Sequence, residues 1–118
     1  QAIIVGAGGF LGTILRYFVA MIPLPGGKEF PLATLAINVL GSLAMGVFAG
    51  LSERLGGHAQ WMAFLRIGIC GGFTTFSSFA LEMSGLFGAG RPWAAVAYAL
   101  ISLILGIAAI AVGRVLVA

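Results

Sequence analysis

The sequence predicts an all-α integral membrane protein in which four helices cross the bilayer. Of the 118 residues, 61% are hydrophobic and 8% are charged, whereas soluble domains carry about 25% charged residues. The mean hydropathy of +1.16 agrees with this class. The apolar residues form four stretches separated by short loops, and each stretch has the roughly 20 residues that a helix needs to cross the hydrocarbon core.

One domain over residues 1–118 is expected to hold the four spans, at about 2–22, 32–51, 60–87 and 93–117. Glycine- and proline-containing loops separate them, which is typical of helix ends. Trp61 and Trp93 stand at span ends, where indole rings favour the membrane interface. The first stretch has no basic segment ahead of it and carries Arg16, so we expect a span here and not a cleaved signal.

The third span is too long and poorly suited to one straight helix. A helix of residues 60–87 would be about 42 Å long, against a hydrocarbon core of about 30 Å. Its centre contains the pair Gly71-Gly72 followed by Thr74 and Thr75, which are poor helix formers. We therefore predict a break near residues 71–75 with a half-helix on each side, whose freed carbonyls could coordinate a cation. The alternative is a continuous helix in which small residues permit close packing.

The six basic residues are scattered and give no footprint for nucleic acid. Three are expected on one side of the membrane (Arg54, Arg66, Arg114) and three on the other (Arg16, Lys28, Arg91). Such a balance gives the positive-inside rule nothing to act on, so the chain could insert in both orientations and pair antiparallel. A chance balance in so small a sample is the alternative.

Polar and small residues form stripes on the spans. Span one repeats Gly8, Gly12 and Arg16, and the arginine either reaches the interface or turns inward to carbonyls of the broken helix. In span two, Asn38 shares a face with Gly41, Ser42 and Met45. An amide within a membrane needs partners, so Asn38 either joins helices or lines a pathway.

Span four carries the stripe Tyr98, Ser102 and Gly106, and Phe76 and Phe79 lie one turn apart after the expected break. The two rings are either packing residues or a site where electropositive ring edges face an anion. No nucleophile–base set, metalloprotease motif or phosphate loop is present, so the sequence does not indicate an enzyme.

Three motifs in order resemble the Fluc (CrcB-type) fluoride channel family. They are Gly8-Gly9-x-x-Gly12-x-x-x-Arg16-Tyr17, Thr34-Leu35-x-x-Asn38-x-x-Gly41-Ser42 and Gly68-x-x-Gly71-Gly72-x-Thr74-Thr75-Phe76-Ser77-Ser78-Phe79. The resemblance covers all four spans. Two positions depart from the family pattern: Thr13 replaces a usual alanine, and Ser78 replaces a usual threonine but keeps the hydroxyl.

The resemblance implies a dual-topology homodimer of antiparallel chains in the bacterial plasma (inner) membrane, with two pathways for passive fluoride efflux. It implies a structural sodium ion at the dimer centre, held by the backbone carbonyls of Gly71 and Thr74. It also implies a set of pathway residues in this chain: Asn38, Phe76, Phe79, Tyr98 and Ser102, with Thr75, Glu82 and Arg16 as further members.

Two other functions are compatible with four short spans. A small multidrug-resistance-type exporter requires an embedded carboxylate, but span one has none, Glu29 and Glu53 are expected in loops, and only Glu82 lies within a span. A structural subunit that conducts nothing would explain the glycine stripes but would give no purpose to a broken span beside polar and aromatic residues.

Overall fold

The computed structural model describes residues 1–25 and 29–118, so Lys28 lies outside the described residues. In this part, four helical stretches are long and apolar enough to cross a membrane. They are α1 (Ala2–Ala20), α2 (Leu32–Leu55), the interrupted stretch Ala59–Gly88 and α6 (Pro92–Leu116). The interrupted stretch consists of α3 (Ala59–Met62), the π-helix η1 (Ala63–Cys70), α4 (Gly71–Phe73) and α5 (Ser77–Gly88).

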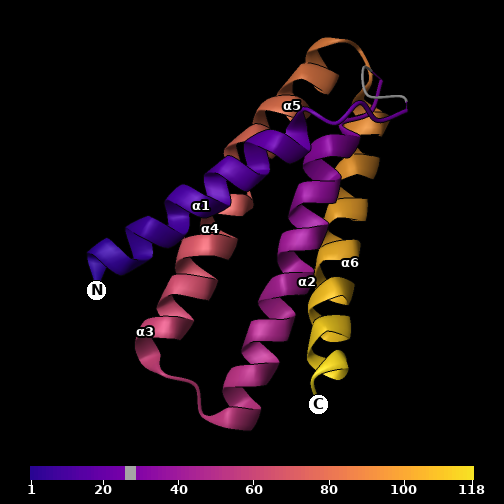
Figure 1. Ribbon diagram of the computed structural model, residues 1–118. Helices are drawn as coiled ribbons and strands as arrows, with labels where there is room; N and C mark the ends of the chain where they lie inside the picture. The colour runs from indigo at the N-terminus through magenta and orange to yellow at the C-terminus, as the bar shows by residue number, and fades with distance from the viewer. Residues whose placement is uncertain (26–28) are drawn as a thin grey trace.

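The ribbon is an elongated bundle in which α2 and α6 run side by side while α1 crosses the other helices at an angle (Figure 1). Its longest dimension is 48 Å, close to the 40–45 Å thickness of a bilayer with its headgroups. The C-terminus and the loop between α2 and α3 lie at one end, and the turn between α5 and α6 lies at the other (Figure 1).

Helix α2 is longer than the sequence predicts, because it continues past residue 51 to Leu55. No strong helix breaker precedes Gly56, which ends the helix in the left-handed conformation at φ 62°. The expectation that Glu53 lies in a loop is therefore wrong. Glu53 belongs to the last turn of α2, where its carboxylate lies 3.3 Å from the Arg114 guanidinium of α6.

The interruption in the third stretch is shorter than expected and lies nearer the C-terminus. Gly71, Gly72 and Phe73 remain helical, and regular helix is absent only at residues 74–76. Thr74 is extended, with φ −80° and ψ 158°, and its hydroxyl donates to the Cys70 carbonyl at 2.9 Å. The two threonines and Phe76 thus interrupt the helix, while Gly72 of the glycine pair is needed for packing.

Glycines allow α1 and the first half of the third stretch to approach closely. Helix α1 packs on η1 at Gly8, where an added Cβ would lie 2.5 Å from the carbonyl oxygen of Phe64. Across the same contact, a Cβ added to Gly72 would lie 2.6 Å from the Gly9 carbonyl oxygen. Backbone contact of this kind stabilises membrane helices, whose association gains nothing from burying apolar surface away from lipid.

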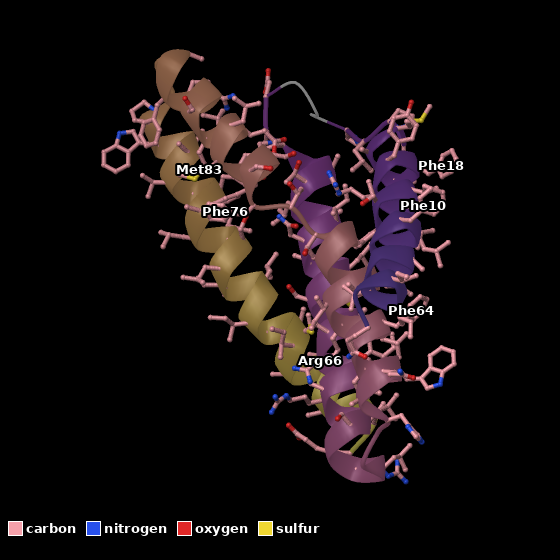
Figure 2. All side chains as sticks on the ribbon, turned by 90° about the vertical axis from the view of Figure 1, so that its left-hand side faces the viewer. Phe10, Phe18, Phe64, Arg66, Phe76 and Met83 are labelled. Carbon is pink, nitrogen blue, oxygen red and sulfur yellow. The ribbon has the colours of Figure 1, made fainter. Side chains whose placement is uncertain are left out.

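The outer surface is strongly apolar. Large side chains such as Phe10 and Trp93 are exposed by 67% and 82%, while Tyr98, Ile37 and Cys70 are the largest fully buried side chains. Figure 2 shows Phe10, Phe18 and Phe64 projecting from the side of α1 and η1. Soluble proteins do not expose apolar surface on this scale, whereas hydrocarbon tails accept it. The chain is a multi-pass membrane protein.

The close approach at Gly8 predicts that alanine substitution at Gly8 and at Gly6 will affect stability differently. We expect Gly8→Ala to lower the thermal unfolding temperature in detergent, because overpacking a tight contact costs about 1–3 kcal/mol. Gly6→Ala on the same helix is the matched control, since an added Cβ at Gly6 meets nothing within 4 Å. Equal unfolding temperatures for the two variants would show that α1 does not pack on η1 in this way.

Candidate functional site

A groove of about 460 Å³ runs between α2, the interruption, α5 and α6. Helix α2 contributes the stripe predicted from the sequence, Asn38 to Met45, which extends for about 10 Å at 1.5 Å per residue. The interruption contributes Thr74, Thr75 and Phe76. The remaining lining comes from α5 and α6: Phe79, Ala99, Ser102, Leu103 and Ile110.

The Asn38 side chain pairs with the backbone of Thr75. Its Nδ2 donates to the Thr75 carbonyl at 3.0 Å, and its Oδ1 accepts from the Thr75 amide N–H at 2.8 Å. Residue 75 lies where the helix cannot satisfy its own backbone, so one side-chain amide replaces both missing helical bonds. Asn38 therefore joins two helices, which is one of the two alternatives that the sequence left open, and it also belongs to the groove lining.

Helix α5 begins at the groove. The Ser78 amide N–H donates to the Thr75 hydroxyl at 3.2 Å, which satisfies one of the free N–H groups of the first turn. The first turn of any helix carries a partial positive charge, which favours a nearby anion. In α5 this turn follows Phe76, a residue of the groove lining.

Two phenylalanine rings form part of the wall. Phe76 is 80% exposed and its ring centroid lies 5.9 Å from that of Phe79, with a 45° angle between the ring planes. Phe79 packs in turn on Tyr98 at 4.9 Å. Figure 2 shows Phe76 on a side of the bundle away from the outward rings of α1. Phe79 thus packs on both Phe76 and Tyr98, while the Phe76 ring is largely exposed at the groove.

Ser102 supplies a polar group without a partner. Its Oγ is buried and is the one buried side-chain oxygen or nitrogen in the described part of the chain that makes no hydrogen bond. The residue belongs to the groove lining. Buried hydroxyls are usually hydrogen-bonded, so Ser102 has hydrogen-bonding capacity left over beside the groove.

A second polar cluster lies behind Phe79. Glu82 accepts a hydrogen bond from the Thr34 hydroxyl at 2.9 Å and a longer one from the Tyr98 hydroxyl at 3.4 Å. Tyr98 is fully buried, and its ring also packs edge-on against Phe30. Neither Tyr98 nor Glu82 belongs to the groove lining.

The Arg16 side chain turns inward. Its Nε donates to the Gly72 carbonyl at 3.1 Å, which is the inward alternative of the two that the sequence left open. The carbonyls of Gly71 and Thr74 accept no hydrogen bond in the part of the chain that the structure describes. Two free backbone oxygens beside a helix end are hard ligands, and they fit a small hard cation such as sodium.

Residues 3–114 match the profile of a family described as CrcB-like protein, Camphor Resistance (CrcB). The match covers all four spans. The chain belongs to the CrcB-like family. Curated relatives agree, and each of three similar ones is named a fluoride-specific ion channel, FluC.

The relative from Erythrobacter litoralis is 43% identical over 119 residues, covering 95% of this chain and 88% of the relative. That from Rhodospirillum centenum is 42% identical over 115 residues, covering 96% and 91%. That from Saccharophagus degradans is 40% identical over 113 residues, covering 95% and 85%. The resemblance to the Fluc (CrcB-type) family that the sequence motifs indicated is confirmed.

In this CrcB-like chain, the groove gathers five of the eight residues predicted for the pathway: Asn38, Thr75, Phe76, Phe79 and Ser102. The other three lie outside its lining, Tyr98 and Glu82 behind Phe79 and Arg16 on the far side of the interruption. Thr34, which donates to Glu82, was not among the predicted pathway residues. It stands one turn before Asn38 on α2, and that spacing could have indicated it.

The Asn38 pairing predicts a specific loss of stability. We expect Asn38→Ala to lower the unfolding temperature and speed amide hydrogen exchange at Thr75, because each unsatisfied backbone group costs about 1–3 kcal/mol. Asn38→Asp keeps the acceptor but loses the donor and should fall between Asn38→Ala and the unsubstituted protein. Ser42→Ala, one turn along the same face, is the control. Equal stability of Asn38→Ala and Ser42→Ala would contradict the structural role of Asn38.

Proposed function

We propose that this chain is a subunit of a fluoride-selective ion channel that lets fluoride leave the cytoplasm passively and so lowers its toxicity. The observation that carries the proposal is the groove itself, which brings a free buried hydroxyl (Ser102), a side-chain amide (Asn38) and two aromatic rings to one wall. Relatives about 40% identical over most of their length bear the name of a fluoride-specific channel.

The chemistry of the groove suits a small, strongly hydrated anion. Fluoride accepts strong hydrogen bonds, so a selective route has to replace its water with closely spaced donors and still release it. The Ser102 hydroxyl and the edges of the phenylalanine rings supply positive groups without a full charge. Among the described residues, no lysine, arginine or carboxylate belongs to the groove lining, so no full charge from this part of the chain traps or repels an anion there.

The interrupted helix reinforces this arrangement by presenting ends of opposite polarity. The first turn of α5 is the positive end of a helix and begins at the groove. The last carbonyls before the interruption form the negative end, where Arg16 covers Gly72. We place the interruption at membrane depth, because regions without regular backbone are tolerated there only against protein or a wet cavity.

The groove needs another wall before it can strip water from an ion. Its volume of about 460 Å³ leaves room for many water molecules around an ion. A second copy in the opposite orientation could close it, since the balance of basic residues between the two ends allows insertion both ways. We therefore propose a dual-topology homodimer in the bacterial inner membrane, with fluoride as the transported ion.

A structural sodium ion would fit at the centre of such a dimer. The Gly71 and Thr74 carbonyls of each copy would hold it, and the ion would supply fixed positive potential near the groove. Gly71 is exposed in the single chain, so its carbonyl is open to a partner. The proposed ion stays bound and takes no part in fluoride movement.

The alternatives suit this structure less well. An exporter needs a carboxylate open to drug and protons, whereas Glu82 is held by Thr34 and Tyr98 outside the groove. A subunit that conducts nothing would leave the buried Ser102 hydroxyl without a partner. The relatives named above are channels and not enzymes, which agrees with a non-enzymatic role.

Reconstitution into liposomes tests the proposal. We expect the purified chain to release fluoride measured with a fluoride electrode and to release no chloride. Phe76→Ile and Phe79→Ile keep apolar bulk but remove the electropositive ring edge, so fluoride release should fall at least about tenfold in one of them, a barrier change of about 1.4 kcal/mol. Comparable fluoride and chloride release would overturn the proposed selectivity.

The control for the two ring variants is Phe10→Ile on the outward face of α1. It removes a ring of the same kind far from the groove lining and should leave fluoride release unchanged. Normal release by both Phe76→Ile and Phe79→Ile would show that these rings serve only in packing.

The sodium proposal makes a separate prediction. Replacing sodium by a large organic cation on both sides of the membrane should lower fluoride flux or the dimer fraction, because the free carbonyls lose their ligand. The reversal potential should follow the fluoride gradient alone. A reversal potential that shifts with the sodium gradient would mean that sodium is transported and is not structural.

A further inference from the structure

A second groove, of about 560 Å³, lies between α2 and the first half of the third stretch. It extends from Ala59 at the start of α3 to Gly71, and its walls are mostly apolar, including Met62 and Ile67. Met45 of α2 lines both this groove and the candidate fluoride groove. Gly71, at the far end of the second groove, stands three residues before Thr74 in the lining of the first. The two grooves therefore adjoin at Met45, the residue that they share.

Arg66 is the charged residue of the second groove. It belongs to the π-helix η1, and its carbonyl accepts a hydrogen bond from the Gly71 N–H, which ties its position to the glycine pair. Figure 2 shows Arg66 on the lower half of the bundle, away from the outward rings Phe10 and Phe18. Its side chain is half-buried, so the guanidinium is neither enclosed in the core nor fully in solvent.

The other arginines show what is unusual about Arg66. The protein has five arginines, and four have a partner in the structure. Arg16 donates to a carbonyl of the interrupted helix, Arg54 to the Val117 carbonyl, Arg91 to the Glu29 carbonyl, and Arg114 pairs with Glu53. Among residues 1–25 and 29–118, Arg66 makes no side-chain hydrogen bond or ion pair.

A guanidinium against an apolar wall needs an anion or water, because a charge in a low-dielectric setting is costly unless it is paired. The groove has room for hydrated ions beside it. The candidate fluoride groove beyond Met45 has donors but, in the part of the chain that the structure describes, no full positive charge. Attraction of an anion from solution therefore needs a charge placed outside the selective section, and Arg66 occupies such a place.

We propose that Arg66 forms an entry site for small hydrated anions at one mouth of the fluoride pathway, from which fluoride passes Met45 into the groove of Asn38 and Ser102. This inference rests on the proposed channel function and assigns the pathway a residue that neither the motifs nor the relatives' names point to. A guanidinium offers several N–H donors to one side of the anion, and water hydrates the other side. It therefore binds the anion weakly and releases it. A charge in a low-dielectric cleft also raises the local concentration of counter-ions.

An entry site has a specific kinetic signature. We expect Arg66→Ala to lower fluoride release about tenfold at low fluoride and low ionic strength, and to leave release at saturating fluoride nearly unchanged. Raising the ionic strength with an impermeant salt should shrink the difference, because salt screens the attraction. Arg66→Lys should keep most of the release. All variants are compared in the same liposomes and at equal amounts of dimer.

The matched control is Arg54→Ala. It removes the same charge near the same end of the molecule, but Arg54 is exposed, donates to Val117 and lines neither groove. Its release at low fluoride should stay within about twofold of the unsubstituted chain. If Arg66→Ala behaves like Arg54→Ala at every fluoride concentration, the entry site is wrong while the channel function stands. If the unsubstituted chain releases no fluoride, the channel function itself fails.

Two other partners of Arg66 would also overturn the inference and give different results. A guanidinium that binds a lipid phosphate would leave fluoride release unchanged in Arg66→Ala, with loss of bound phospholipid in native mass spectrometry. A guanidinium that pairs with a second copy would lower the dimer fraction of Arg66→Ala in detergent and in liposomes. An unchanged dimer fraction together with reduced release at low fluoride supports the entry site.

Discussion

The pairing of the Asn38 amide with the backbone of Thr75 is the contact on which the candidate site depends. A chain that leaves helical geometry inside an apolar environment exposes an N–H and a carbonyl that lipid cannot satisfy, each at a penalty of several kcal/mol. One asparagine satisfies both groups, with hydrogen bonds of 2.8 and 3.0 Å. Without this amide, the Thr75 N–H and carbonyl would both lose their partner at the point where α5 begins.

The second consequence of the pairing is a division between two faces of the chain. Glycines at the crossing of α1 and η1 bring the backbones into contact, so that side of the third stretch is closed. Asn38 holds the opposite side of the interruption against α2, where Ser102 and Phe76 leave an open groove. Small residues thus determine where the helices pack closely, and the groove lies on the side where Asn38 holds the interruption.

Much of this architecture could be predicted from the sequence because it depends on composition and period. The four spans follow from apolar length, and the stripe from Asn38 to Met45 follows from helical spacing. The position of the interruption was less predictable, since local propensity points to the glycine pair. Gly72 instead stays helical because α1 packs against its backbone, and this tertiary contact is not encoded in local sequence.

The π-helix η1 and the polar cluster behind Phe79 could not be predicted from local sequence either. Nothing in residues 63–70 distinguishes an α-helix from a π-helix, because the difference lies in the register of backbone hydrogen bonds. The link between Thr34 and Glu82 joins residues 48 positions apart, so it needs the fold to bring α2 and α5 together. Spacing within one helix could indicate Thr34 as a candidate but could not name its partner.

The charged groups around the groove are placed in a way that suits an anion in it. The Glu82 carboxylate is the one negative side chain near the groove among the described residues, and Thr34 and Tyr98 hold it behind the ring of Phe79. Coulomb energy falls with distance, and the hydroxyls of Thr34 and Tyr98 that donate to the carboxylate offset part of its charge, so this placement weakens repulsion of an anion in the groove. The positive groups have a different distribution. The groove wall carries only partial positive charges, and the full charges of Arg16 and Arg66 lie beyond its lining. A full positive charge in the wall would bind an anion too tightly to release it. Along the proposed pathway, an anion would therefore be attracted from a distance and held only weakly where it must move, which is the balance that selective conduction requires.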